Sequence, residues 1–321
     1  MEVVLTTVVV TGADGFIGRA CVPALARAGH TVRGLVRALS TETAARPEFM
    51  AAGDLTRLSE AAMGVALRDA NAVVHLAGLA HRAGASPATL RAVNVEATAR
   101  LARAAASQGV DHFIFASSVK VNGETTLPGH PFRESDPPNP LDAYGASKWA
   151  AERALAEVAE SSGMRTTVLR LPLTYGPGAK ANVAALSHAV RWGVPLPLAG
   201  IDNRRSILGV GNLAAALAAL LASERDAQSV ATYFVADANA VSTPALVEAM
   251  ARAMRIPPRL FALPTSLLRV AGAWSGRSEM VERLLDTLEV DTAAFRTRFA
   301  WSPPYALDEG MAHALRPGAS L

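Results

Sequence analysis

The chain has 321 residues, 50% of them hydrophobic, and a mean hydropathy of +0.22, so it can bury a large core in one large domain with a smaller appendage. Its formal net charge is only +3, and its arginines are scattered without a basic run, which argues against nucleic-acid binding. Lysine is rare and occurs only at Lys120, Lys148 and Lys180.

A few residue types indicate the compartment and the metal content. The single cysteine, Cys21, cannot form an internal disulfide, which fits a reduced, cytoplasmic compartment. The N-terminal residues lack the basic region and the cleavage site of a signal peptide. The longest apolar run, residues 213–222, is about half of what a bilayer span requires. The histidines show no metal-ligand spacing, so we predict no membrane insertion and no metal site.

The first strand leads into a glycine turn. Residues 7–11 form a β-branched run typical of a buried parallel strand, and a helix is predicted over 19–28. Glycines between them would let the backbone approach a pyrophosphate, and the free N–H groups of the helix would bind the anion. The spacing is G-x-x-G-x-x-G, which departs from G-x-G-x-x-G, and a turn without a ligand is the alternative. The predicted cofactor-binding residues are Gly12, Gly15, Phe16, Ile17 and Gly18.

The second strand, predicted over 31–36, ends at Arg37. NAD-selective proteins usually have a carboxylate here for the ribose 2′-hydroxyl. With no carboxylate to repel a 2′-phosphate, and a guanidinium to bind it, Arg37 favours NADP(H) over NAD(H), which stays the alternative. An exposed arginine without a ligand is the other interpretation.

The next elements continue the alternation of strands and helices. Asp54, followed by Leu55, is expected either to accept a hydrogen bond from the adenine or to cap the following helix. A strand over 72–78 ends in residues that leave room for a cofactor, namely Leu76, Ala77 and Gly78. A helix over 87–108 carries Asn94, and a strand follows over 112–118. This order predicts an α/β fold with a doubly wound parallel sheet and ligands at the carboxyl ends of its strands.

Tyr144 and Lys148 lie four residues apart in a helical pattern from 144 to about 160, so they share one face of a helix. A fixed positive charge favours a phenolate and lowers the pKa of the phenol. Tyr144 would then exchange a proton with a carbinol or carbonyl oxygen. For an isolated pair, a surface tyrosine and lysine would be the simpler interpretation.

Together these motifs resemble the extended short-chain dehydrogenase/reductases, the NAD-dependent epimerase/dehydratase family. The matching segments are 11–18, 75–78, 117–118 and 144–148. The resemblance implies a Rossmann domain with a smaller C-terminal α/β substrate domain. It further implies that Ser118 and Tyr144 contact the sugar oxygen being oxidised or reduced, that Lys148 holds the nicotinamide ribose, and that Asn94 and Pro172 belong to the cofactor site.

The resemblance also implies a nucleotide-sugar site. Asn182 and Arg205 match positions that contact the nucleotide diphosphate, and Arg283 falls where relatives often have another nucleotide contact. A guanidinium can bind phosphate oxygens in a fork. Three alternatives remain: Asn182 as a helix cap, Arg204 in place of Arg205, and Arg283 as an ordinary surface residue.

The loop after the serine strand, residues 119–124, is similar to that of a bacterial surface-polysaccharide subgroup acting on UDP-linked N-acetylated sugars. Lys120 and Asn122 are expected to contact the sugar, although a solvated Lys120 is an equal alternative. The resemblance implies NADPH-dependent reduction of the C4 ketone of a UDP-4-keto-6-deoxy-N-acetylhexosamine. The alternatives are a UDP-sugar 4-epimerase using tightly held NAD, against which Arg37 argues, and a non-catalytic NADP-binding sensor. A 4,6-dehydratase lacks its acid and base after Ser118.

The second half of the chain completes the sheet and builds a lobe over the ligand. We expect a NADP-binding domain of residues 1–171 with about 207–236, and a nucleotide-sugar domain of about 172–206 with 237–321. The elements predicted here are helices near 182–193, 212–223, 244–255, 278–285 and 290–299 and a strand near 232–235. The resemblance implies a homodimer built on the helices at 87–108 and 145–160.

Overall fold

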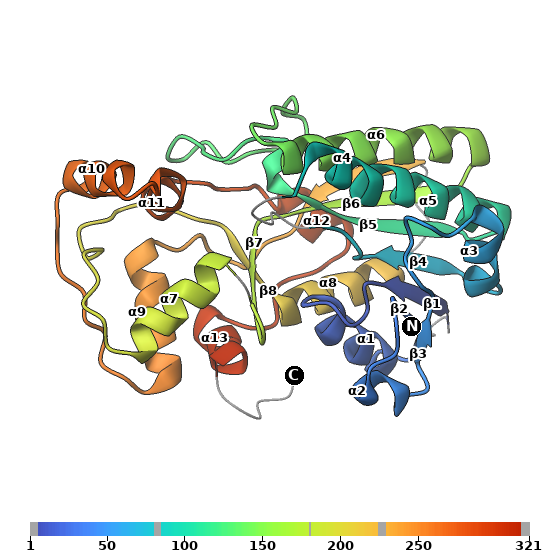
Figure 1. Ribbon diagram of the computed structural model, residues 1–321, viewed down its shortest axis with the longest axis horizontal. Coiled ribbons are helices and arrows are strands. Elements are labelled where there is room, and N and C mark those ends of the chain that lie inside the picture. Colours follow the sequence, from blue (N-terminus) through green and yellow to red (C-terminus); the bar gives the residue numbers. More distant parts are fainter. Residues whose placement is uncertain (1–5, 80–84, 180, 224–228, 316–321) are drawn as a thin grey trace.

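The computed structural model describes residues 6–79, 85–179, 181–223 and 229–315 (Figure 1). Within these ranges, seven parallel strands form one sheet in the order β3-β2-β1-β4-β5-β6-β9. Neighbouring β1 and β4 mark the point where the strand order reverses, and open α/β sheets bind their ligands there. The strands are β1 Thr7–Thr11, β2 Thr31–Val36, β3 Phe49–Ala51, β4 Ala72–His75, β5 His112–Ser118, β6 Arg165–Leu171 and β9 Val230–Phe234.

The strand predictions agree closely with the structure. β2 and β5 have the predicted bounds, because β-branched and aromatic runs covered on both faces are typical of buried parallel strands. β4 ends at His75, three residues before the predicted end at 78. The cause is local, since the backbone N–H of Ala77 donates to the Thr11 hydroxyl at 3.2 Å and no longer to a strand backbone.

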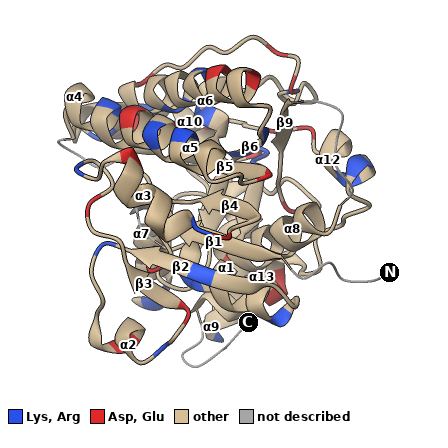
Figure 2. Ribbon diagram, turned by 90° about the vertical axis from the view of Figure 1, so that its right-hand side faces the viewer, with Lys and Arg blue, Asp and Glu red and all other residues tan. Residues whose placement is uncertain are grey.

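Helices cover both faces of the sheet (Figure 1). On one face α1 (Gly18–Arg27), α8 (Val210–Leu221) and α12 (Ala293–Arg298) enclose a core with Cys21, Leu217 and Phe295. On the other face the core is formed by α3 (Glu60–Leu67), α5 (Ala97–Ser107) and α6 (Ala143–Ser162). The predicted doubly wound α/β fold is confirmed. Viewed from the side, acidic and basic residues are interspersed over the helices (Figure 2).

The helix predicted over 87–108 is interrupted. It begins as α4 (Pro87–Leu90), widens into the π-helical segment η1 (Arg91–Glu96) and continues as α5. A π turn holds one more residue than an α turn and frequently occurs at functional sites. Asn94 lies in this wide turn and is buried.

The smaller lobe lies at the left of Figure 1. Its two-stranded parallel sheet pairs β7 (Leu173–Tyr175) with β8 (Ile207–Gly209). Leu186, Met250 and Met311 belong to its core. Its helices are α7 Ala181–Arg191, α9 Thr243–Met254, α10 Thr265–Trp274, α11 Ser278–Leu285 and α13 Leu307–Leu315. Sequence analysis did not predict α10 and α13, and the exact division of the chain into two domains stays a prediction.

Candidate active site

The glycine turn forms a cradle without side chains between β1 and α1. Gly12 has a φ of +64°, and a Cβ atom there would lie 2.8 Å from the backbone nitrogen of Ala77 at the end of β4. A Cβ atom on Gly18 would overlap the carbonyl oxygen of Gly12. The turn therefore admits no side chain at these two glycines, and it lies at the N-terminus of α1, where free N–H groups attract an anion.

The end of β4 leads from this cradle to the centre of the sheet. A Cβ atom on Gly78 would lie 3.3 Å from Oδ1 of Asn94 and 3.4 Å from Nζ of Lys148. Because glycine stands at this position, residue 78 places no side chain against the Lys148 ammonium. Leu76 and Ala77, which precede Gly78, are half-buried. The structure thus brings together the two halves of the predicted cofactor site.

At the end of β2, Arg37 is exposed, and its carbonyl accepts a hydrogen bond from Gly53 at 3.1 Å. Asp54 accepts hydrogen bonds from the backbone N–H and the hydroxyl of Thr56, which lower the pKa of Asp54, as does the nearby Arg37 guanidinium. Asp54 therefore closes its own turn. The alternative that Asp54 caps the following helix is wrong, because Ser59 caps α3. Leu55 lies half-buried in the same turn.

Ser118 and Tyr144 meet at the carboxyl end of β5. Ser118 is the last residue of that strand, and Tyr144 is the second residue of α6, whose N-cap is Asp142. The Ser118 hydroxyl acts on the phenol and lowers the pKa of Tyr144. Burial has the opposite and larger effect and raises the pKa of Tyr144 to about 12. The predicted lowering of this pKa is thus not seen, because desolvation of the phenolate outweighs the influence of Ser118.

Lys148 lies one turn further along α6 and is buried. Its ammonium donates to the carbonyl of Ala116 at 2.9 Å and lies 4.5 Å from the centre of the Phe115 ring. Burial lowers the pKa of Lys148 to about 8, against the influence of the Glu152 carboxylate, which raises it. Lys148 is therefore anchored to β5, with a pKa close to neutrality.

Asn94 connects the end of β4 to the first turn of α6. Its Oδ1 accepts from the Leu79 N–H at 2.8 Å, and its Nδ2 donates to the Leu79 carbonyl at 3.1 Å and to the Ser147 hydroxyl at 3.0 Å. Ser147 in turn donates to the carbonyl of Tyr144 at 2.7 Å. The Asn94 amide thus fixes the backbone around Tyr144.

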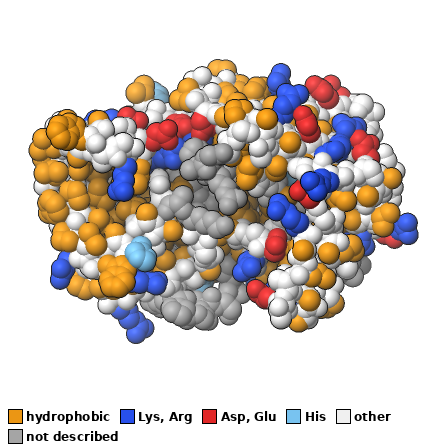
Figure 3. Space-filling model, viewed as in Figure 1, with side chains coloured by type: hydrophobic (Ala, Val, Ile, Leu, Met, Phe, Trp, Pro, Cys, Tyr) orange, Lys and Arg blue, Asp and Glu red, His pale blue; other side chains and the backbone are white. Residues whose placement is uncertain are grey.

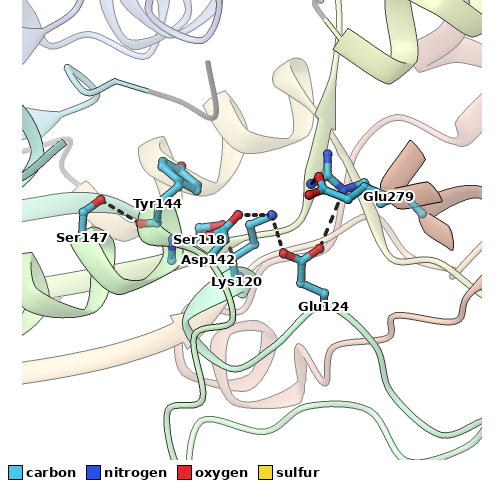
Figure 4. A network of polar contacts seen from close by, with 9 residues as sticks. Ser118, Lys120, Glu124, Asp142, Tyr144, Ser147 and Glu279 are labelled. Carbon is cyan, nitrogen blue, oxygen red and sulfur yellow. Dashed lines mark hydrogen bonds and ion pairs between the residues drawn. The ribbon is translucent and has the colours of Figure 1, made fainter. Parts of the chain in front are cut away.

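Lys120 is held between two carboxylates (Figure 4). Its ammonium lies 2.5 Å from Oδ2 of Asp142 and 2.7 Å from Oε1 of Glu124. The other carboxylate oxygen of Glu124 lies 3.7 Å from Nε of Arg283 on α11. The alternative of a freely solvated Lys120 is therefore wrong. These contacts link the loop after β5 with the start of α6 and with the smaller lobe.

A second polar network lies buried behind the site. The Glu152 carboxylate accepts from Arg170 at 2.7 Å and from the Ser117 hydroxyl at 2.5 Å. Arg170 also donates to Oδ1 of Asn122 at 2.9 Å, and Asn122 donates to the Asp136 carbonyl at 3.3 Å. Both ends of the Asn122 amide are thus engaged away from solvent. Sequence analysis missed Glu152 and Arg170, although a lone arginine inside an apolar strand was a usable signal.

The predicted nucleotide residues lie in the smaller lobe or at its border. Arg205 donates to the Asp286 carbonyl at 2.8 Å, and burial lowers the pKa of Arg205. Arg283 donates to Glu279 at 3.2 Å, whereas Arg204 is paired with Glu289 at 2.8 Å. Arg205 and Arg283 influence each other electrostatically. Asn182 lies in the first turn of α7 and Pro172 between β6 and β7.

Comparison with known proteins places this arrangement in a family. The model of the NAD dependent epimerase/dehydratase family matches residues 8–236. The chain belongs to this family. It is 36% identical to the UDP-glucose 4-epimerase of Vibrio cholerae over 311 residues, which span 95% of this chain and 93% of the relative. The family resemblance predicted from the motifs is confirmed.

Solved structures of similar fold cover almost the whole of this chain. The UDP-N-acetylglucosamine 4-epimerase from Bacillus cereus is 20% identical, with a TM-score of 0.77, covering 96% of this chain and 97% of that chain. MoeE5 in complex with UDP-glucuronic acid and NAD is 26% identical, with a TM-score of 0.75 and the same coverage. These similarities confirm the Rossmann fold.

The epimerase/dehydratase family is NAD-dependent, and the chain fits such a cofactor. The glycine turn offers a cradle that a Cβ atom would fill, and Gly78 leaves the approach to Lys148 open. In the described part of the chain, no helix is long and apolar enough to cross a bilayer. The same residues contain no cluster of three or more His, Cys, Asp or Glu side chains suited to a metal ion.

Proposed function

We propose that this protein is a UDP-sugar 4-epimerase, which inverts the configuration at C4 of a nucleotide-linked hexose. The proposal is carried by the placement of Ser118 beside Tyr144, one helical turn from Lys148, in a chain that is 36% identical to the Vibrio cholerae UDP-glucose 4-epimerase over nearly its whole length. This is the alternative in the sequence analysis, and the comparisons support it better than the 4-ketoreductase.

The chemistry requires a base that works reversibly. NAD, when bound, supplies the oxidation and the later reduction of the sugar carbon. Tyr144 takes the proton of the C4 hydroxyl in the first half of the reaction and returns it in the second half. Ser118 donates a hydrogen bond to the same oxygen and so stabilises the charge that develops on it. Lys148, protonated, holds the ribose and favours the phenolate of Tyr144.

The diphosphate of the substrate requires cations in the smaller lobe. We assign this role to Arg205 and Arg283, with Asn182 at the start of α7. Arg283 is well placed because its guanidinium already faces an anion, the Glu124 carboxylate, at 3.7 Å. A diphosphate would compete with Glu124 for this guanidinium through the stronger, forked hydrogen bonds of phosphate. Lys120 and Asn122 remain proposed sugar contacts, although both are held by protein groups.

The second candidate is the NADPH-dependent 4-ketoreductase, and one observation favours it. Arg37 is exposed at the end of β2, and its guanidinium could bind a 2′-phosphate. Asp54 lies in the turn after β3, and the Arg37 charge lowers the pKa of its carboxyl group. An Arg37–Asp54 pair accommodates NAD as well as NADP, so Arg37 does not outweigh the full-length similarity.

A single set of incubations separates the two candidates. The purified full-length protein is given UDP-glucose or UDP-N-acetylglucosamine without added cofactor, and the C4 epimers are measured by NMR. We expect both configurations to appear, because an epimerase regenerates its cofactor. If no epimer forms but NADPH is consumed with UDP-4-keto-6-deoxy-N-acetylglucosamine, the protein is the ketoreductase. Tyr144→Phe is the control for both reactions.

We also propose a homodimer in which α5 and α6 of one subunit pack against those of its partner. Half-buried alanines on α5, and half-buried and exposed alanines on α6, would allow close approach. Light scattering on the purified protein measures the mass directly, and a monomer at micromolar concentration would contradict this assembly.

A further inference from the structure

Helix α10 in the smaller lobe has an apolar face that none of the described residues covers. Leu267, Val270, Ala271 and Trp274 follow at spacings of three and four residues, so they lie on one side of the helix. The exposed fractions are 52% for Leu267, 56% for Val270 and 92% for Trp274. An indole so fully exposed at the end of an apolar stripe marks a surface that binds something.

This face is not the one that holds α10 in the fold. Leu268 and Gly272 are the buried residues of the helix, and a Cβ atom on Gly272 would lie 2.8 Å from the Val281 side chain on α11. The helix therefore packs against α11 with one side and exposes a second apolar side to solvent. A helix that is only amphipathic would expose polar residues there.

The exposed apolar surface extends beyond α10. Phe261 precedes the helix and is 46% exposed, and its backbone N–H donates to the Leu196 carbonyl at 3.0 Å. This pairing brings the segment after α7 alongside, with Val194 and Trp192 exposed. We call these residues the α10 surface: Trp192, Val194, Phe261, Leu267, Val270, Ala271 and Trp274. Figure 3 shows hydrophobic side chains gathered over this end of the molecule.

The segment that carries α10 is positively charged, whereas Glu279, Glu282 and Asp286 follow on and after α11. Residues 255–277 contain four arginines and neither aspartate nor glutamate. Arg269 is paired with Asp286 at 3.0 Å, while no ion pair among the described residues holds the other three. All four are exposed, and they are Arg255, Arg259, Arg269 and Arg277. A binding partner of the α10 surface must therefore offer both an apolar environment for its side chains and negative charge for its arginines.

We propose that the α10 surface docks on an anionic lipid bilayer. Tryptophan, phenylalanine and leucine on one side of a helix, flanked by arginines, is the composition that lies in the interface between lipid headgroups and acyl chains. Arginines near that surface are attracted by anionic headgroups. A second copy of the chain is the weaker choice, because it would bring two sets of unpaired arginines together.

Docking in this way would not require a transmembrane helix. α10 leads directly into α11, which carries Arg283, so the lobe proposed to hold the nucleotide sugar would rest on the bilayer. The inference stands on the α10 surface alone, and it holds whether the protein is an epimerase or a reductase.

The test is flotation of the full-length protein with vesicles of equal parts phosphatidylglycerol and phosphatidylcholine, and with pure phosphatidylcholine. We expect binding to the anionic vesicles and at least tenfold weaker binding to the neutral ones. Raising the salt from about 0.1 M to about 1 M shortens the Debye length from about 10 Å to about 3 Å and should release the protein.

Two pairs of substitutions separate the apolar and the charged contributions. One double variant carries Leu267→Ser and Trp274→Ser, and the other carries Arg259→Glu and Arg277→Glu. Each should lose most of the binding, since each arginine near a bilayer raises the affinity for anionic vesicles about fivefold. The matched control is Val65→Ser, because Val65 is 65% exposed on α3 in the larger domain. All variants should keep the wild-type turnover of nucleotide sugar, because none lies in the proposed site.

A spectroscopic measurement identifies which side chain enters the bilayer. Tryptophan emission should shift to shorter wavelength on adding anionic vesicles, and Trp274→Phe should remove most of this shift while retaining binding. Equal binding by wild type and the Leu267→Ser, Trp274→Ser variant would overturn the proposal. So would light scattering showing that this variant reduces a stable oligomer to a smaller one, since the surface would then be a protein interface.

Discussion

The ammonium of Lys120 lies 2.5 Å from Oδ2 of Asp142, and the other oxygen of the same carboxylate accepts the N–H of Gly145 at 2.6 Å. Asp142 thereby caps the helix that carries Tyr144, and its negative charge raises the pKa of Tyr144. Lys120 offsets this effect by neutralising the carboxylate. We interpret Lys120 as a positioning residue. Because Lys120 is positively charged, Asp142 can cap α6 without raising the pKa of Tyr144, the proposed base, as far as a free carboxylate would.

Replacing Lys120 with methionine should therefore shift the pH dependence of turnover. Without the ammonium, Asp142 disfavours the Tyr144 phenolate more strongly, so the rise of kcat with pH should move upward by roughly one pH unit. At neutral pH this gives about a tenfold lower kcat. Lys120→Arg retains the charge and should retain most of the wild-type profile. An unchanged profile in Lys120→Met would contradict this role.

Removing the Tyr144 hydroxyl tests the proposed base directly. Tyr144→Phe should lower kcat by about 10² to 10⁴ fold, the usual contribution of general acid–base catalysis. Cofactor binding, measured by calorimetry, should persist, because the ring still fills its half-buried position. Tyr305→Phe is the matched control, since it deletes the same group outside the site. Full activity in Tyr144→Phe would place the base on another residue.

The glycine turn offers a pair of matched substitutions. Gly12 and Gly109 both have positive φ, +64° and +73°, but only Gly12 would place a Cβ atom against neighbouring backbone. Gly109→Ala should cost roughly 1–2 kcal/mol of folding stability from the left-handed conformation alone. Gly12→Ala should cost more and should also abolish NAD binding. Denaturant unfolding and calorimetry measure the two effects, and equal behaviour of the variants would argue against a close approach at Gly12.

The buried pair Glu152–Arg170 should be far more sensitive than an exposed pair. Arg170→Met leaves the Glu152 carboxylate buried without its partner, which costs about 3–5 kcal/mol. Arg103→Met breaks a bridge of 2.6 Å to Glu60 whose side chains are 48% and 44% exposed, which costs about 0–1 kcal/mol. Urea unfolding of the Arg170→Met and Arg103→Met variants measures the two losses of folding free energy. Adding Glu152→Leu to Arg170→Met should restore much of the loss, and a failure to do so would mean that packing dominates.

Two buried histidines should make the protein sensitive to acid. Burial, aided at His75 by the Lys148 charge and at His112 by Arg165, lowers both pKa values from 6.5 to about 3. Between these values the unfolded chain binds more protons than the folded one. Above about pH 6.5 both histidines are neutral in the folded and the unfolded chain, and the free energy of unfolding is unaffected by them. As the pH falls from about 6.5 towards 3, each histidine lowers the free energy of unfolding by roughly 1.4 kcal/mol per pH unit. Denaturant unfolding at several pH values measures the slope, and His112→Asn should reduce it by about half.

Much of the larger domain was predictable because its signals are local. Val8, Val9 and Val10 are fully buried, as a β-branched run leading into a glycine-rich turn suggests. The glycine spacing and the four-residue interval between Tyr144 and Lys148 likewise indicate the site, because helix and strand geometry fix which residues share a face.

The remaining features of the fold and of the site depend on contacts between residues distant in sequence. That Asp142 and Glu124 hold Lys120 follows only from the packing of the β5 loop against α6 and α11. The pKa of Tyr144 was predicted in the wrong direction, because burial of its phenol cannot be read from a helical pattern. α10 was missed for another reason: its apolar residues 267–274 contribute largely to an exposed surface, so their pattern has no core to explain it.

The wide turn of Arg91–Glu96 fixes the length of the polypeptide at this point. Because a π turn takes up one residue more than an α turn, deleting one residue here would restore an ordinary α turn and remove the wide turn that carries Asn94. Asn94 would then face away from Leu79 and Ser147. A surface loop tolerates insertions and deletions, but in this helix they should disrupt the site. The segment works as a spacer in which the number of residues matters more than their identity.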